Sequence, residues 1–254
     1  MAEAQFRFYE ELNDFLPPER RKQDIIYHIR DRETVKHAIE ACGVPHAEVE
    51  LILVNGESVG FSCYVRDGDR ISVYPRFEAF DISPQLKVRK EPLRNLRFIA
   101  DVHLGGLAKY LRMLGFDVLY SETYTDEQIA GISARERRIV LTHDRDLLMH
   151  RIITHGRFIR ATRIRNQLIE VVETLDLYRN FSPFSRCMEC NTKLVPVSKD
   201  DIKTRLPPDT QNYFTQFALC MLCDRIYWQG SHYRRMRRFI TEIFGDRSLN
   251  AAAV

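Results

Sequence analysis

The pattern of apolar and polar positions in residues 1–80 predicts an antiparallel sheet packed around one helix. Thr34 is placed to cap a helix over residues 35–42, which Gly43 ends. Segments that alternate apolar and polar side chains, or that run apolar between turn residues, predict the strands. These segments are residues 6–16, 24–29, 49–56, 58–65 and 66–77.

The period of the pattern changes at residue 96, after a segment, 81–95, whose prolines and charges predict a linker. Apolar strand-like runs then alternate with amphipathic helical segments through short connections. That alternation predicts a parallel sheet with helices on both faces over residues 96–180. The predicted strands are 97–101, 117–120, 139–142 and 157–162, and the predicted helical segments are 104–116, 126–136, 146–152 and 164–177.

The order of elements in the first 80 residues resembles the β-grasp, or ubiquitin-like, fold: a hairpin, a helix, short strands and a closing strand after DGDR. The segment VNGESVGFSCYVRDGDRISVYP looks especially like the sulfur-carrier branch of that fold. Sulfur carriers act through a free C-terminal Gly-Gly, whereas here Pro75, Arg76 and Phe77 continue into more chain. The resemblance therefore implies a docking module for a protein partner, with sulfur transfer as the weaker alternative.

Aspartates follow two of the predicted parallel strands, at the edge of the sheet where functional residues gather. Asp101 closes the strand 97–101, and Asp144 and Asp146 come just after Thr142, the end of another strand. Asp126 opens the helix after the strand 117–120, where a capping role is equally consistent. Clustered carboxylates suit Mg²⁺ or Mn²⁺, and such ions assist the attack of water on a phosphodiester. Each aspartate alone is best read as a cap or turn residue, but together they favour a metal site.

Two CxxC pairs are the most specific signal in the chain. Cys187 and Cys190 form the first pair, and Cys220 and Cys223 form the second. Four thiolates provide the closed tetrahedral set that is typical of structural zinc. Residues 181–245 are therefore predicted to form a zinc ribbon, which either only stabilises the fold or also presents groups that contact RNA.

The C-terminal third of the chain carries an excess of positive charge, with 12 basic and 7 acidic residues in 179–254. Four arginines beside aromatic residues suit the phosphates and bases of RNA, although a solvated helix face fits the composition as well. These arginines are Arg234, Arg235, Arg237 and Arg238. Tyr227, Trp228, His232 and Tyr233 are the predicted stacking surfaces.

The bulk composition is that of a soluble globular protein, with 44% apolar and 29% charged residues and a formal net charge of +3. No apolar run approaches the ~18 residues needed to span a bilayer, and the N-terminus lacks a signal-peptide layout. We therefore expect a cytoplasmic protein with no membrane partner, in which the six cysteines do not form a disulfide framework. The chain has no glycine-rich phosphate-binding loop, which argues against a nucleotide cofactor.

The block RFIADVHLGGLAKYLRMLGFDVLY…TDEQIAGISARERRIVLTHDRDLL, with the CxxC pairs and YWQGSHYRRM, resembles the Mutator-seven C-terminal RNase domain, a zinc-ribbon branch of the PIN-like nucleases. The N-terminal block resembles the ubiquitin-like domain often fused to it. The resemblance spans residues 96–240 and implies RNA cleavage by acidic residues around Mg²⁺ or Mn²⁺. It matches Asp101 to the acid that ends the first strand, Asp126 to the acid that opens the second helix, and Asp144 to the acid of a Thr-x-Asp motif. Thr142 is the threonine of that motif.

Two positions depart from the family pattern. The family commonly has a basic residue where Gly106 stands and Arg in the position of His143. Lys109 keeps a positive charge on the next helical turn, so Lys109 and His143 are the expected phosphate contacts, and His143 is also a candidate proton donor. Asp146 matches a position that varies in the family, so it is a second-rank ligand, less secure as a metal ligand than Asp101, Asp126 and Asp144. PIN-like domains often dimerise, so a homodimer is a further expectation.

Together these patterns predict an α/β PIN-like parallel-sheet domain at 96–180, preceded by an α+β β-grasp domain at 1–80 and a linker at 81–95. A zinc ribbon with a basic segment follows at 181–245. The predicted function is a metal-dependent ribonuclease with Mg²⁺ or Mn²⁺ at the aspartates, structural Zn²⁺ and RNA as its partner. The alternative is a non-catalytic RNA- or ribosome-binding protein with a degenerate PIN-like core.

Overall fold

The computed structural model describes residues 2–30, 32–75 and 96–245. The predicted linker, residues 81–95, lies outside these residues. The chain folds into two compact units. The first unit comprises Met1–Asp101 and Tyr124–Phe158, and the second comprises Val102–Thr123 and Ile159–Val254.

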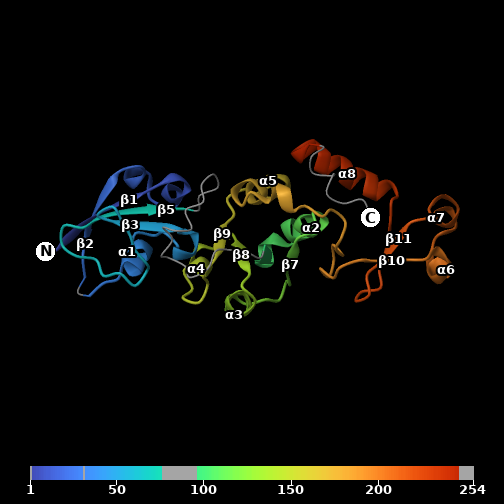
Figure 1. Cartoon of the computed structure of the whole chain (residues 1–254), viewed down its shortest axis with the longest axis horizontal. Coiled ribbons are helices and arrows are strands. Elements are labelled where there is room, and N and C mark those ends of the chain that lie inside the picture. Colours follow the sequence, from blue (N-terminus) through green and yellow to red (C-terminus); the bar gives the residue numbers. More distant parts are fainter. Residues whose placement is uncertain (1, 31, 76–95, 246–254) are drawn as a thin grey trace. The chain divides into compact units, whose positions relative to one another are not determined.

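A five-stranded sheet forms the N-terminal part of the first unit. Its strands are β1 (Glu3–Phe8), β2 (Asp24–His28), β3 (Leu51–Val54), β4 (Glu57–Ser58) and β5 (Arg70–Tyr74). They lie in the order β2-β1-β5-β3-β4, with β1 and β5 parallel and the other pairs antiparallel. Helix α1 (Val35–Ala41), capped by Thr34 as predicted, packs against the sheet (Figure 1), and Phe6, Ile39 and Ile71 are buried in their shared core. The β-grasp prediction is confirmed.

The predicted first strand, residues 6–16, is too long. Strand β1 ends at Phe8, and Glu10–Phe15 form a 3-10 helix, η1. Glu10 has a left-handed φ of 43°, which turns the chain. The side-chain amide of Asn13 donates hydrogen bonds to the carbonyls of Phe8 and Glu10 at 2.9 and 3.0 Å. This local side-chain bonding replaces the sheet ladder, and strand periodicity does not reveal it.

The strand predicted over residues 58–65 is present only as β4, which ends at Ser58. Val59 N still donates to Ile52 O of β3 at 3.0 Å, and the segment then bonds to the start of α1. Val35 N, at the first residue of α1, donates to Cys63 O at 2.7 Å. The segment therefore provides a hydrogen-bond acceptor for the first turn of α1. Its alternation of apolar and polar residues is the same as that of a strand, so the pattern does not reveal this role.

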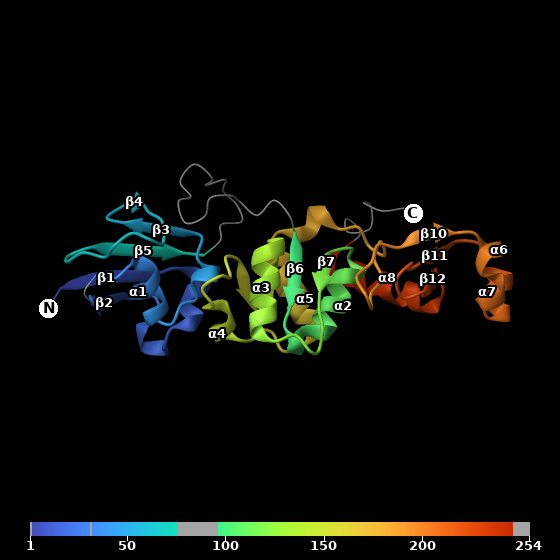
Figure 2. The same ribbon diagram turned by 90° about the horizontal axis from the view of Figure 1, so that it is seen from below.

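Three strands of the first unit run parallel to one another. They are β6 (Arg97–Ala100), β8 (Ile139–Thr142) and β9 (Gly156–Phe158), with β8 between the other two. Helix α3 (Asp126–Glu136) packs along β6 (Figure 2) and also contacts β8. The short helix α4 (Arg145–Leu148) follows β8. The side chains at the centre of β6 and β8 are wholly buried, which explains their continuous apolar pattern. The predicted parallel sheet is confirmed.

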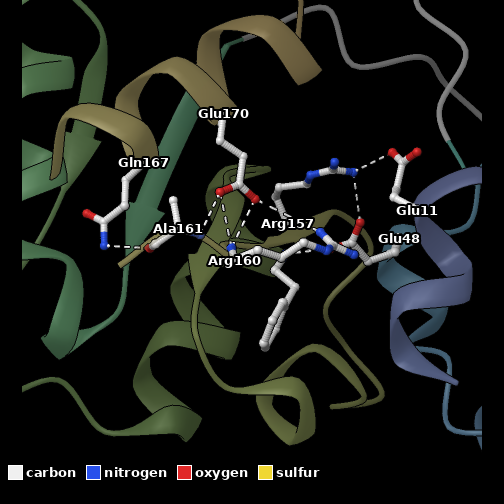
Figure 3. Close-up of polar contacts among 8 residues, drawn as sticks. Glu11, Glu48, Arg157, Arg160, Ala161, Gln167 and Glu170 are labelled. Atoms are coloured by element: carbon white, nitrogen blue, oxygen red, sulfur yellow. Dashed lines mark hydrogen bonds and ion pairs between the residues drawn. The ribbon is translucent and has the colours of Figure 1, made fainter. Parts of the chain in front are cut away.

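The strand predicted over 157–162 is shorter in the structure because the next backbone amides are taken by a carboxylate. Arg160 N and Ala161 N donate to the side chain of Glu170 at 2.9–3.1 Å (Figure 3). Glu170 lies on helix α5 (Ile164–Thr174) of the second unit. An acidic residue on the amphipathic helix thus ends the extended segment.

The second unit contains helices packed together and a small antiparallel sheet with the order β10-β11-β12. Helices α2 and α5 contact each other in this unit, and α6 and α7 are inserted between β10 and β11. Its elements are α2 (Gly105–Met113), β7 (Asp117–Leu119), α5, β10 (Val195–Val197), α6 (Lys199–Ile202), α7 (Pro208–Tyr213), β11 (Phe217–Leu219), β12 (Ile226–Trp228) and α8 (Ser231–Phe244). Within the described residues, no helix is both long and apolar enough to cross a lipid bilayer.

Short 3-10 helices connect several of these elements. The two that concern the sites below are η1 and η3, which lie in the N-terminal part of the first unit. The 3-10 helices other than η1 are η2 (Pro18–Arg20), η3 (His46–Glu48), η5 (Val102–Leu104), η6 (Leu177–Asn180) and η7 (Lys203–Arg205).

Candidate active site and metal centre

Asp101 lies directly after β6, and two donors from the end of β8 hold its carboxylate. The Thr142 hydroxyl donates to Asp101 Oδ2, and the main-chain N–H of His143 donates to the same oxygen at 3.0 Å. Asp101 is only 4% exposed, so its orientation is set by the fold. The prediction that two strand ends bring their polar residues together agrees with this geometry.

The hydroxyl of Thr142 also connects Asp101 to Asp144. It donates to Asp101 Oδ2, and it accepts a hydrogen bond from Asp144 N at 2.8 Å. Asp144 in turn caps α4, because its Oδ1 accepts from Asp146 N at 2.7 Å and from Leu147 N at 3.4 Å. Thr142 therefore orients both aspartates, and Asp144 combines an exposed carboxylate with the capping role that the sequence left open.

Asp126 is the first residue of α3 and is not its cap. Thr125 caps the helix, with its hydroxyl accepting from Gln128 N at 3.3 Å and its own N–H donating to Gln128 Oε1 at 3.0 Å. The exposed Asp126 carboxylate is thus not needed for capping. Partial burial raises the pKa of Asp126 most, and negative charges that include Asp144 and Asp101 raise it further. The negative charges of Asp144 and Asp101 therefore act on Asp126.

The aspartates and the cysteines differ in how tightly they gather. In the described part of the chain, the four cysteines are the one set of three or more His, Cys, Asp or Glu residues whose ligand atoms all lie within 4.8 Å of one another. Asp101, Asp126 and Asp144 are further apart. Their carboxylate oxygens are nevertheless the donors that a hard divalent cation takes, and such an ion would neutralise their negative charge.

The remaining predicted residues of the acidic edge differ in position. Asp146 is exposed, with 86% of its side chain accessible, and lies 3.9 Å from Arg145 Nε. His143 is half-buried, and its main-chain N–H is the group that reaches Asp101. Asp146 therefore faces solvent, which is consistent with a second-rank ligand.

In the second unit, Lys109 and Gly106 lie on α2. Lys109 Nζ is 3.2 Å from both carboxylate oxygens of Glu189, a residue of the first CxxC pair. A Cβ at Gly106 would lie 2.5 Å from Ile164 Cδ1 on α5, so a larger residue there requires the Ile164 side chain to move. Gly106, where the family commonly has a basic residue, thus lies where α2 packs closely on α5. Lys109 forms an ion pair with Glu189.

The four cysteine sulfurs converge as predicted. Cys187 Sγ is 3.5 Å from Cys223 Sγ, and Cys190 Sγ is 3.3 Å from Cys220 Sγ. Burial raises the pKa of Cys190, but hydrogen bonds with Thr192 and the neighbouring thiols outweigh it and bring the value to about 6. Burial, then hydrogen bonds with Cys220 and Cys187, raise the pKa of Cys223 to about 12. The cluster therefore accepts a first negative charge readily, whereas four thiolates together require a cation.

Each CxxC segment turns back immediately after its second cysteine. Asn191 and Asp224, the next residues, have left-handed φ values of 71° and 59°. Asn191 N donates to Cys187 O at 3.0 Å, and Asp224 N donates to Cys220 O at 2.8 Å. Two equivalent turns present their sulfurs to one point, and the set can bind zinc.

Hydrogen bonds of Arg112 and Asn191 join the first CxxC turn to α2 and β7. Arg112, a buried residue of α2, donates from Nη1 to the carbonyls of Met188 and Glu189 at 3.1 and 2.7 Å, and from Nε to Val118 O at 2.9 Å. Asn191 Oδ1 accepts from Val118 N at 3.0 Å. Sequence reasoning missed Arg112, although a basic residue at an apolar position of a helix was a signal for it.

Helix α8 has a basic side and an aromatic side. The ring of Tyr233 packs on Phe184 at a centroid distance of 4.4 Å, and that of Phe239 packs on Tyr110 at 4.9 Å. Ile240 is wholly buried. The four predicted RNA-binding arginines are all exposed: Arg234, Arg235, Arg237 and Arg238. The helix thus uses one side for packing and presents the arginines to solvent.

Most of the predicted stacking residues have roles within the fold. Tyr227 Oη is 3.0 Å from Cys187 Sγ, and Tyr233 packs on Phe184. Trp228 packs partly buried against a small core of the C-terminal sheet. Of the predicted set, His232 is the exposed member. A base-stacking surface made of all four residues is therefore not what the structure presents.

A ubiquitin-like domain, a parallel sheet with aspartates at its strand ends and a four-cysteine cluster define a modular protein of the nuclease-like class. The chain belongs to the Mut7-C RNAse domain family, whose sequence model matches residues 96–240. The model of the Mut7-C ubiquitin domain matches residues 1–81. The resemblance inferred from the sequence is confirmed by both matches. No curated protein and no solved structure matches the chain significantly.

Proposed function

We propose that this protein is a metal-dependent ribonuclease that hydrolyses RNA phosphodiester bonds at the acidic edge of its parallel sheet. The observation that carries the proposal is the hydrogen-bonded set in which Thr142 joins Asp101 to Asp144. Asp126 lies near enough to this set that their charges, after partial burial, raise its pKa. Carboxylates gathered at one edge of a sheet, with charges that act on one another, are typical of sites that bind divalent cations. Membership of the Mut7-C RNAse domain family supports the same reaction class.

Asp101, Asp126 and Asp144 would hold Mg²⁺ or Mn²⁺, with Asp146 as an outer ligand. When bound, such an ion stabilises the negative charge on the attacking and leaving oxygens of the phosphodiester. Thr142 keeps the carboxylate of Asp101 oriented, and the cap hydrogen bonds do the same for Asp144. His143 is next to this set and is the candidate to contact the phosphate or to give a proton to the leaving oxygen.

The test is cleavage of end-labelled single-stranded RNA by the full chain. We expect no cleavage in buffer freed of Mg²⁺ and Mn²⁺, and cleavage when either ion is added, with the zinc content of the protein unchanged throughout. A chain that binds RNA but leaves it intact with both ions would contradict the proposal. That result would favour the second candidate, a non-catalytic RNA-binding protein, which the exposed arginines of α8 support on their own.

The arginines of α8 provide a separate prediction about RNA binding. We expect Arg234→Ala/Arg238→Ala to reduce the slope of log affinity against log salt concentration by about 1.4, since each lost phosphate contact on a single strand accounts for about 0.7. Filter binding or fluorescence anisotropy at several salt concentrations measures the slope. Arg20→Ala/Arg66→Ala removes the same charge from exposed positions of the ubiquitin-like domain and is the matched control. Equal slopes for the two double variants would assign α8 a packing role only.

A further inference from the structure

The ubiquitin-like domain contacts the edge of the parallel sheet within the first unit. Strand β9 is the last strand of its sheet, and the 3-10 helix η3 packs against both β9 and α4. The ring of Phe15, at the end of η1, meets the ring of Phe158 edge-on at a centroid distance of 5.5 Å. An edge strand exposes unpaired backbone groups and needs cover. Here the cover comes from the helical turns of the ubiquitin-like domain.

A buried ion pair lies at the centre of this contact. Glu48 Oε2 is 3.0 Å from Arg157 Nη1, and the two side chains are 1% and 8% exposed. Glu11 Oε1 is 2.9 Å from the same Nη1 (Figure 3). The other oxygen of Glu48 accepts the main-chain N–H of Phe158. One carboxylate therefore pairs a buried charge and caps a backbone donor of the edge strand, so its loss removes a charge partner of Arg157 and the acceptor of Phe158 N together.

The same contact reaches the short helix that presents Asp144. A Cβ at Gly156 would lie 2.3 Å from Leu148 Cδ2, at the end of α4, and 3.4 Å from Ala47 Cβ, in η3. Gly156 thus allows α4, β9 and η3 to meet at one point. On the loop between α4 and β9, Ile153 O lies 2.8 Å from Nε2 of the buried His46. Helix α4, whose N-terminal cap is Asp144, therefore contacts both the parallel sheet and the ubiquitin-like domain.

We propose that the ubiquitin-like domain is an intramolecular positioning partner of the nuclease sheet. Glu48, with Arg157, fixes η1 and η3 against β9 and α4, and this contact keeps α4 and its cap Asp144 in place. The inference rests on the proposed nuclease function for its consequence, but its physical content, the ordering of α4, is independent of cleavage. It also means that an external protein partner of the ubiquitin-like domain must use a surface other than η1 and η3.

The experiment is hydrogen–deuterium exchange of the full chain, read by mass spectrometry, with Glu48→Gln as the main variant. We expect amides of 144–149 and 153–158 to exchange about tenfold faster, because local opening becomes easier when the buried pair is lost. Glu11→Gln, at a partly exposed position, should cause a smaller change in the same segments. Arg7→Gln disrupts an exposed ion pair with Asp24 elsewhere in the ubiquitin-like domain and should leave both segments unchanged.

Kinetic measurements separate positioning from general stability. If wild type cleaves RNA, Glu48→Gln should lower kcat with KM unchanged, and a higher Mn²⁺ concentration should restore part of the rate. Unchanged exchange in 144–149 in both Glu48→Gln and Glu11→Gln would overturn the inference, whatever the cleavage result. Faster exchange in that segment without any cleavage by wild type would support the positioning role and contradict the proposed nuclease function.

Discussion

Asp101→Asn is expected to lower the rate of RNA cleavage by on the order of 10²–10³-fold, with little change in the fold. The side-chain oxygen of Asn can still accept the hydrogen bonds from Thr142 and from His143 N, which both go to one oxygen of Asp101. The amide nitrogen then replaces the other oxygen. It carries no charge and cannot bind a cation, so the variant removes a ligand while it keeps the buried contacts.

The matched control is Asp146→Asn, which removes the same charge from the same edge of the sheet. Because the Asp146 side chain is 86% exposed and its contact to Arg145 is long, we expect its cleavage rate to stay within about fivefold of wild type. Single-turnover cleavage with saturating Mn²⁺ measures both rates, and thermal unfolding checks that both variants are folded. Equal rates for Asp101→Asn and wild type would remove Asp101 from the active site.

The strand ends could be predicted from the sequence because they depend on local patterns. Apolar runs of the length of β6 and β8 indicate buried parallel strands, and such strands bring their carboxyl ends to one edge. Asp101 and Asp144 follow from that rule with no knowledge of packing. Thr142 is the last residue of β8, which is consistent with its hydroxyl linking the two aspartates.

Other features could not be predicted because they depend on contacts between distant parts of the chain. Glu48 and Arg157 are 109 residues apart, and no periodicity of two or 3.6 residues relates them. The left-handed turn at Glu10 that ends β1 depends on how the Asn13 amide is placed. Tyr227 reads as an available aromatic residue, yet its hydroxyl lies against a cysteine sulfur. The residue type limits the interactions that a side chain can make, and its packing in the fold decides which of them it makes.

Cys220→Ser is expected to abolish zinc binding and to lower the Tm of the second unit by roughly 10 °C or more. The serine hydroxyl does not ionise near neutral pH, and the neighbouring thiols already resist a second negative charge, as the raised pKa of Cys223 indicates. A site with three thiolates would therefore hold the ion far more weakly. Metal analysis of the purified protein and differential scanning calorimetry measure the two effects.

The effect should extend beyond the ribbon because the first CxxC turn is bonded to α2 and β7. Arg112 donates to carbonyls of that turn and to Val118 O, so disorder of the turn leaves a buried guanidinium without the carbonyls of Met188 and Glu189. We expect faster amide exchange in 105–119 as well as in 187–223. Cys63→Ser, at a cysteine outside the cluster, should change neither zinc content nor exchange in these segments. Retained zinc in Cys220→Ser would contradict a four-cysteine site, and loss of zinc with 105–119 still protected would confine its role to the ribbon.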